Sequence, residues 1–230
     1  MQSGASRLFT LFLLGAVGVG DLPQFQDVRN WGREDCLRVL TESPWAAKET
    51  SIRIVGGVGS GVQGEKEIYN TFYVRLFSAR PVRFAYLRLL QLTGNLSEQR
   101  KRDLSELSRG ADAKSVFERW IVVSVTFRCN DPREQARIER FFQTETTRTM
   151  KTRAFLSTDK HPRVELAAYY PPQNQLVGAK FVFPRYLGGE PVVTAEDRAL
   201  VFEFDTPVSG PELRVRFEVP KLLVGGELEL

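Results

Sequence analysis

The sequence predicts an α+β protein: a mostly antiparallel or mixed sheet of about seven to nine strands, with two or three helices packed on it, after an N-terminal signal segment. Three observations support this fold class. Residues Trp120–Cys129 alternate apolar and polar side chains, as a strand with one buried face does. Short alternating segments recur from residue 153 onward. Between these two regions, Asp131 and Pro132 open a helical pattern.

The N-terminal residues have the features of a secretory signal peptide. Arg7 precedes an apolar run, Leu8–Val19, and small residues lead to a cleavage site after Gly20. A helix of this run would be about 18 Å long, which is too short for a hydrocarbon core of about 30 Å. We therefore predict a signal peptide at residues 1–20 and export of the mature chain, with an uncleaved N-terminal anchor as the alternative.

The composition is that of a globular domain. Hydrophobic residues make up 42% of the chain and charged residues 26%, which argues against disorder. We expect residues 21–230 to form a single α+β domain, with residues 21–50 as an N-terminal helical lead-in. The formal charge of +4 becomes +3 without Arg7. This excess permits an anionic partner, but it does not predict binding to nucleic acid.

A short helix is predicted after Gly32, and its apolar side carries Cys36, Leu37 and Leu40. The helix should end before Pro44, because the residue that precedes a proline avoids the α conformation. Trp31 and Trp45 bracket it. We expect both tryptophans to be buried against the sheet, and exposed stacking on a ligand is the alternative.

A glycine-rich segment separates two predicted strands, 51–55 and 69–77. Within it, Gly59–Gly64 matches the pattern G-x-G-x-x-G. A dinucleotide site also needs a helix directly after the glycines, so that its N-terminal amides meet the pyrophosphate. Because a strand follows instead, we predict a hairpin connection and no nucleotide cofactor. The next helix should begin at Pro81 and end at Gly94.

The helix that begins after Asp131 should continue to about Arg148. Its apolar stripe, Ile138 and Phe142, is expected to pack against the apolar face of Trp120–Cys129. At about 100° per residue, four arginines lie within about 80° on the opposite side of this helix. These are Arg133, Arg137, Arg140 and Arg148. They could contact an anionic partner or a membrane surface, and a plain solvated face is the alternative.

The polar face of Trp120–Cys129 carries Ser124, Thr126 and Arg128. We expect this face to be solvated, or to be a binding surface on the sheet. The two strand–helix units, 72–92 and 120–148, could be parallel neighbours, which is why a mixed sheet stays open.

The second half of the chain is predicted to consist of strands, at 153–158, 164–170, 179–184, 199–205 and 213–219. Turn residues such as Gly188-Gly189 separate them. A last hairpin is expected about Gly225-Gly226.

The sequence marks no reaction centre. The two cysteines, Cys36 and Cys129, either form one disulfide in an exported protein or remain two buried thiols. His161 is the single histidine and lies in a turn-like segment, so a zinc site would be short of ligands. We predict no catalytic, cofactor-binding or metal-binding residues. Hydrolysis by carboxylates stays open, because 28 acidic residues are present.

Two parts of the chain resemble one group of proteins. Trp31, Glu34–Leu37 and Leu40–Ala46 resemble the opening of a group of uncharacterised exported acidobacterial proteins. Arg75–Arg83 and Gly226–Leu230 are similar to the same group. The resemblance implies a bacterial exported protein, and it implies no activity, substrate or functional residue.

Together, these features predict an exported, non-catalytic binding or structural accessory protein of the bacterial periplasm or cell surface. Its partner would be an unidentified protein or another component of the envelope. The alternative is a secreted hydrolase that uses carboxylates or a serine without a recognisable motif.

Overall fold

The computed structural model describes residues 25–56, 65–92, 117–173, 177–208 and 212–230. The predicted signal peptide and the Gly59–Gly64 pattern lie outside these residues, as does the expected end of the second helix at Gly94.

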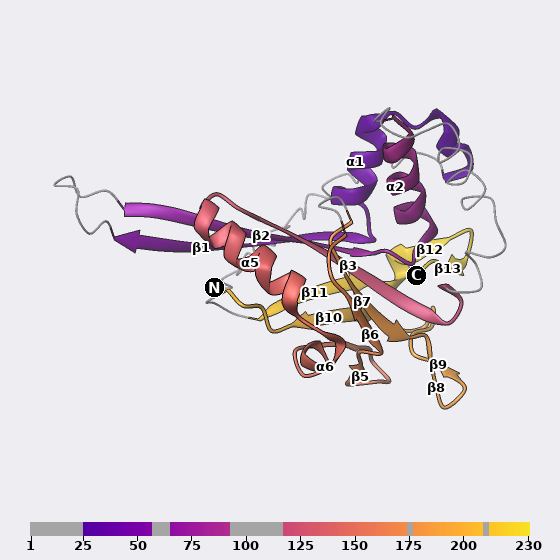
Figure 1. Ribbon diagram of the computed structural model, residues 1–230. Helices are drawn as coiled ribbons and strands as arrows, with labels where there is room; N and C mark the ends of the chain where they lie inside the picture. The colour runs from indigo at the N-terminus through magenta and orange to yellow at the C-terminus, as the bar shows by residue number, and fades with distance from the viewer. Residues whose placement is uncertain (1–24, 57–64, 93–116, 174–176, 209–211) are drawn as a thin grey trace, which may run out of the picture.

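Most of the strands form two sheets that pack face to face (Figure 1). The larger sheet has five strands in the order β1-β2-β3-β7-β6: β1 Ala46–Gly56, β2 Glu65–Leu76, β3 Trp120–Cys129, β7 Ala179–Pro184 and β6 Ala168–Tyr170. The smaller sheet has four, in the order β11-β10-β4-β5: β11 Leu213–Glu218, β10 Ala199–Phe204, β4 Ala154–Ser157 and β5 Val164–Glu165.

The pairings confirm the predicted α+β class with an antiparallel sheet. Every pairing among the described strands is antiparallel. The strands β2 and β3, which open the two strand–helix units, are neighbours but run in opposite directions. The mixed sheet that the sequence left open is therefore not formed by these strands.

The helices have the following bounds: η1 Phe25–Asn30, α1 Arg33–Glu42, α2 Arg80–Leu92, α5 Pro132–Thr144, α6 Thr147–Met150 and η2 Val219–Leu222. Among these, none combines the length and the apolar character that a membrane crossing needs.

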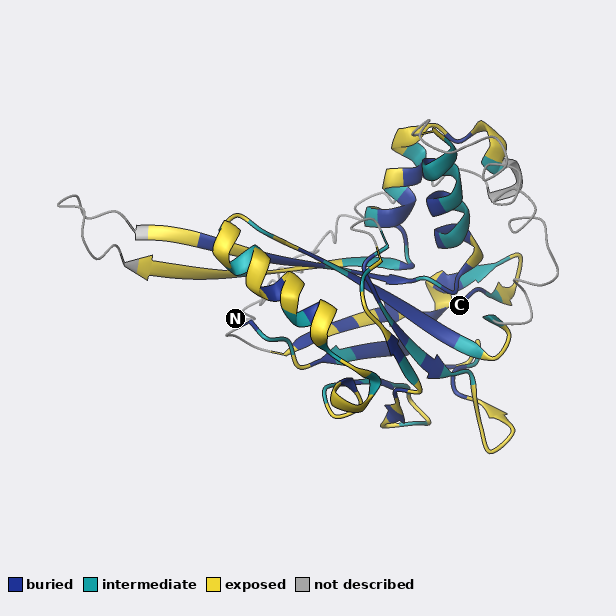
Figure 2. Cartoon of the chain, viewed as in Figure 1, coloured by how far each residue is buried: buried dark blue, intermediate teal, exposed yellow. Residues whose placement is uncertain are grey.

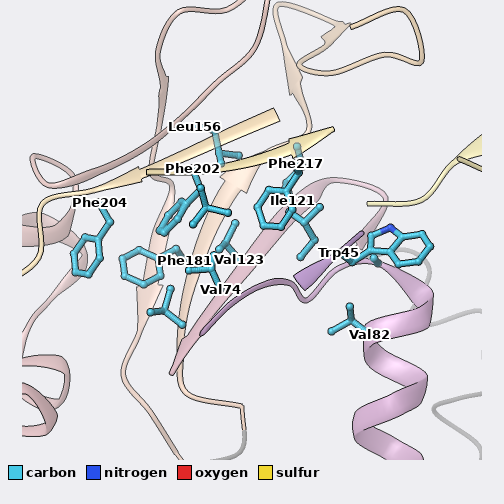
Figure 3. Close-up of a cluster of buried hydrophobic side chains, with 14 of the residues drawn as sticks. Trp45, Val74, Val82, Ile121, Val123, Leu156, Phe181, Phe202, Phe204 and Phe217 are labelled. Carbon is cyan, nitrogen blue, oxygen red and sulfur yellow. The ribbon is translucent and has the colours of Figure 1, made fainter. Parts of the chain in front are cut away.

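The core lies between the sheets and is rich in phenylalanine (Figure 3). The ring of Phe181 on β7 lies 5.4 Å from that of Phe202 and 5.2 Å from that of Phe204, both on β10. Phe183 lies 6.2 Å from Phe202. All four side chains are fully buried. Side chains that alternate along each strand thus fill the space between the sheets, and tilted ring pairs add to the stabilisation by burial.

α1 and α2 pack on each other and cover one end of the outer face of the larger sheet (Figure 1). Trp31 and Trp45 are both buried, as predicted. Arg75 of β2 ties this layer to the sheet, because its Nε donates to the carbonyl oxygen of Leu40 at 2.6 Å. That carbonyl lies in the last turn of α1, where a cation is favourable. In α1 itself, Leu37 is 38% exposed and does not belong to the buried stripe.

β3 is buried on both faces over most of its length, so the expectation of a solvated polar face was wrong for most of the strand. Ser124 has no exposed surface. It lies beneath α2, where Tyr86 interacts with it. Thr126 is half-buried, and Arg128 is exposed. The helical layer therefore covers all but the C-terminal end of this face.

β1 and β2 continue beyond the rest of the sheet as a projecting hairpin (Figure 1). β2 pairs with β3 only from Asn70 onward, whereas its pairing with β1 extends to the Gly56–Glu65 pair. We call Ile52–Gly56 together with Glu65–Tyr69 the arm. Figure 2 shows that the arm is largely exposed.

The strands predicted for the second half of the chain are present, except that one of them is divided in two. The segment predicted at 164–170 splits into β5 and β6, which belong to different sheets. Gly188-Gly189 and Gly225-Gly226 form tight hairpin turns with positive φ at both glycines. The strands of these two hairpins are β8 Tyr186–Leu187, β9 Glu190–Pro191, β12 Leu223–Val224 and β13 Glu227–Leu228.

Candidate functional site

A cavity with a volume of about 460 Å³ lies between the C-terminal end of β3 and α5. This volume is within the range of small-molecule sites, about 300–1,000 Å³. Its lining residues come from three parts of the chain: Val125, Thr126, Phe127, Arg128, Ala136, Glu139, Arg140, Phe142, Gln143, Pro172, Gln173 and Gly178.

The cavity exists because β7 is shorter than β3. β7 pairs with β3 only up to the Val125–Ala179 pair. The chain reaches β7 through Gly178, whose φ is +77°. A β-carbon at this position would lie 2.2 Å from the carbonyl oxygen of Val125. Glycine therefore lets the chain pass closely over β3, and beyond it one side of β3 has no neighbouring strand among the described residues.

α5 closes that side of β3 with a side chain in place of a strand. The Gln135 carboxamide accepts a hydrogen bond from the Cys129 backbone N–H at 2.7 Å and donates to the Phe127 carbonyl oxygen at 3.5 Å. Its Nε2 also donates to Glu139 Oε1 at 2.7 Å. Gln135 thus binds the backbone edge much as a strand would.

The start of α5 is fixed as the sequence predicted. Asp131 accepts a hydrogen bond from the Glu134 backbone N–H at 2.9 Å, and Pro132 is the first helical residue. Lys66 of β2 lies 2.5 Å from the same carboxylate. The bond from Lys66, with that from Glu134, lowers the pKa of Asp131 from 3.8 to about 2. The ionised carboxylate therefore caps the first turn of α5 and also joins α5 to the arm through Lys66.

The cavity has an apolar floor and a charged rim. Phe127 and Phe142 are almost completely buried, and Gln143 Nε2 donates to the Pro172 carbonyl oxygen at 2.8 Å, which fixes the far wall. Arg128 and Arg140 are exposed at the rim. No carboxylate of a described residue pairs with the Arg140 guanidinium. The rim thus carries two cations and one carboxylate, Glu139.

The structure brings together part of the predicted arginine face. Arg133, Arg137 and Arg140 are exposed on α5. Arg137 forms an ion pair with Glu134 at 2.7 Å. Arg148 does not belong to this helix, because α5 ends at Thr144 and a separate short helix, α6, begins at Thr147. Of the four predicted arginines, Arg140 alone lines the cavity.

Both cysteines are free thiols, so the disulfide considered from the sequence is not formed. Cys36 is buried in α1, and burial raises the pKa of its thiol to about 11. Cys129 is half-buried at the end of β3, and its Sγ accepts a hydrogen bond from the Asp131 backbone N–H at 3.3 Å. Each cysteine therefore has a packing role in its own element.

Within the described residues, no three His, Cys, Asp or Glu side chains are grouped closely enough to hold a metal ion. His161 lies in a turn, and its backbone N–H donates to Thr158 Oγ1 at 3.1 Å.

Comparison with known protein families, with curated proteins and with solved structures finds no match to this chain. The chemistry of the candidate site therefore rests on its own residues.

Sequence reasoning missed Gln135, Glu139, Gln143 and Gly178. Gln135 and Gln143 lie on the α5 side that meets β3, where polar residues carry no signal of their own. Gly178 directly precedes a predicted strand, and a glycine at that point is a weak indication of close backbone approach.

Proposed function

We propose that the protein is an exported, non-catalytic binding protein whose cavity beneath α5 takes a small ligand with an apolar body and an anionic group. The proposal is supported by the combination of an apolar floor, Phe127 and Phe142, with the Arg140 guanidinium at the rim, which pairs with no carboxylate of a described residue. Ligand sites typically join apolar walls to a few polar groups that fix orientation. Export is proposed from the predicted signal segment, and a bacterial envelope location is proposed from the resemblance to exported acidobacterial proteins.

The chemistry of the cavity favours binding over catalysis. Its one lining carboxylate, Glu139, is hydrogen-bonded to Gln135. A glycosidase would need two carboxyl groups across the reacting bond, and a serine hydrolase would need a base beside its nucleophile. The cavity lining described above contains no serine, cysteine or histidine. The hydrolase alternative thus gains no support from this site.

Titration with anilinonaphthalene sulfonate tests the proposal, because this probe joins an apolar ring system to a sulfonate. We expect saturable fluorescence enhancement at one site per chain. Arg140→Glu should weaken binding about tenfold, equivalent to about 1.4 kcal/mol, since it replaces an attraction by a repulsion. Ala136→Trp should abolish binding, because Ala136 lines the cavity and the larger side chain would fill it.

Arg133→Glu is the matched control. Arg133 is an exposed arginine on the same helix and does not line the cavity. Its charge reversal should change the affinity by less than about twofold. If Arg140→Glu and Arg133→Glu weaken the probe equally, or if Ala136→Trp leaves binding intact, the cavity is not the ligand site.

A further inference from the structure

Among the described residues, no strand pairs with the outer edge of β1. β1 is the last strand of the larger sheet, and Lys48–Thr50 and Ile52–Val55 are exposed. Ile52 and Ile54 each keep 60% of their surface exposed. Soluble proteins usually protect such edges with proline, bulges or a covering element. β1 contains no proline, and its register with β2 continues without a bulge from one end to the other.

The backbone groups that point to this edge can be identified. In an antiparallel strand, the N–H and C=O of one residue point to the same side, and the side alternates along the chain. The Leu76 N–H donates to the Trp45 carbonyl oxygen at 2.9 Å. Odd-numbered residues therefore bond to β2, and the even-numbered residues from Lys48 to Ile54 point their backbone groups to the free edge. The Thr50 and Thr71 hydroxyl oxygens, 3.0 Å apart, agree with a pair that exchanges no backbone bonds.

Symmetry limits how a second copy could add its own β1 to this edge. In an antiparallel pair about a two-fold axis, the residues whose backbone groups point to the free edge must lie opposite each other, so even-numbered residues face even-numbered residues and odd-numbered residues face odd-numbered residues. In one such register the axis passes between Ser51 and Ser51 of the second copy, which face each other. That register places Glu49 opposite Arg53 of the second copy, and symmetry forms the same pair twice. Registers centred on Glu49 or on Arg53 would instead place like charges opposite each other, which is unfavourable.

The register centred on Ser51 also joins the apolar surfaces of the two arms. Ile52 and Tyr69 are cross-strand partners, so their side chains share a face. Tyr69 is 39% exposed. In this register Ile52 lies diagonal to Ile52 of the second copy, at about 7–8 Å, within reach of long side chains. Tyr69 and Ile52 of both copies would form one apolar strip across the interface.

We propose that the chain forms a homodimer through β1, in the register that places Ser51 opposite Ser51 of the second copy. The larger sheets of the two copies then become one continuous sheet. This interface is independent of the cavity beneath α5, so either proposal can fail without the other.

Charge reversal and rescue test the interface in the full chain by sedimentation velocity over a range of concentrations. We expect wild-type dimers that dissociate on dilution. Glu49→Arg or Arg53→Glu should raise the dimer dissociation constant at least tenfold, because each creates two pairs of like charges. The double variant E49R/R53E exchanges the charges and should restore the wild-type constant. Arg133→Glu, on α5, should leave it unchanged.

Cysteine cross-linking tests the register. Residues that face each other without exchanging backbone bonds have Cα atoms about 4.5 Å apart, which suits a disulfide. Ser51→Cys should therefore form a covalent dimer on mild oxidation. Thr50→Cys and the wild-type chain, with its buried Cys36 and half-buried Cys129, should not.

Three results would overturn the proposal. The first is a chain that stays monomeric at all concentrations. The second is a dimer that survives both charge reversals. The third is cross-linking through Thr50→Cys in preference to Ser51→Cys, which would show a different register.

Discussion

At the scale of single residues, Gly178 lets the chain pass close to β3 as it enters β7. It is buried, its φ is +77°, and a β-carbon there would meet both the Val125 carbonyl oxygen at 2.2 Å and Thr126 Cγ2 at 2.5 Å. A side chain at this position would therefore destabilise the fold in two separate ways. It would be strained by the left-handed backbone conformation, and it would clash with the backbone of β3.

Gly178→Ala should lower the free energy of unfolding by about 3 kcal/mol, because neither β3 nor the glycine backbone can move without breaking ladder bonds. Urea-induced unfolding measures the change. Gly188→Ala separates the two costs, since Gly188 also has positive φ, +60°, but nothing lies within 4 Å of its β-carbon position. That control should lose only about 1 kcal/mol. Equal losses in the two variants would contradict the contact with Val125.

At the scale of elements, the start of α5 is joined to the arm by one ionised side chain. Asp131 caps the helix and pairs with Lys66 of β2. Its folded-state pKa, about 2, lies below the ordinary value of 3.8. A lowered folded-state pKa means that the unfolded chain binds the proton first as the pH falls. The stabilisation is therefore complete above about pH 5 and is lost progressively as the pH falls towards about 2.

Asp131→Asn keeps the capping oxygen but removes the charge. The variant should therefore lose less stability than the wild type between about pH 5 and about pH 2. Denaturant unfolding at several pH values in this range gives the slope of the free energy of unfolding against pH for the wild type and for the variant. Other carboxylates with lowered pKa values, such as Glu218, are present in both proteins and cancel in the comparison. Equal slopes would show that the Lys66–Asp131 pair does not act in the folded protein.

Most elements could be predicted from the sequence because their signals are local. The alternation of β11 and the Asp131-Pro132 start of α5 depend on neighbouring residues only. The end of α5 also had a local signal, which the prediction overlooked. Thr146 and Thr149 form a capping box that begins α6, and this new helix start interrupts the expected run to Arg148.

The burial of Ser124 and the position of the cavity could not be predicted in this way. A serine on a strand with alternating apolar and polar residues indicates a solvent-exposed face. However, α2 comes from another part of the chain and places Tyr86 over Ser124. Likewise, the cavity depends on the register at which β7 meets β3. That register is a long-range property, and the residues at the junction, Gly178 and Gln135, belong to no motif.

At the scale of the whole molecule, two sheets and an outer helical layer share one core. The buried cluster includes Trp31. It extends from Trp45, near α1, through β3 to Phe202 and Phe217 in the smaller sheet (Figure 3). A continuous core favours cooperative unfolding of the whole described region, as a single domain would show. Trp31 and Trp45 lie in a different part of this core from the inter-sheet phenylalanines, so the two groups can report on it separately.

Phe202→Ala tests this cooperativity. Phe202 is fully buried between the sheets, so the truncation should cost about 3–5 kcal/mol, a large part of the stability of a typical domain. In a Trp120→Phe background, which removes the tryptophan of β3, tryptophan fluorescence should report the same shift in the unfolding midpoint as far-UV circular dichroism, although Trp31 and Trp45 lie beside the helices α1 and α2. Tyr170→Ala, at a residue 52% exposed on β6, should shift neither by more than about 0.5 kcal/mol. If Phe202→Ala moved the dichroism transition but left the tryptophan transition in place, the helical layer would fold independently of the two sheets.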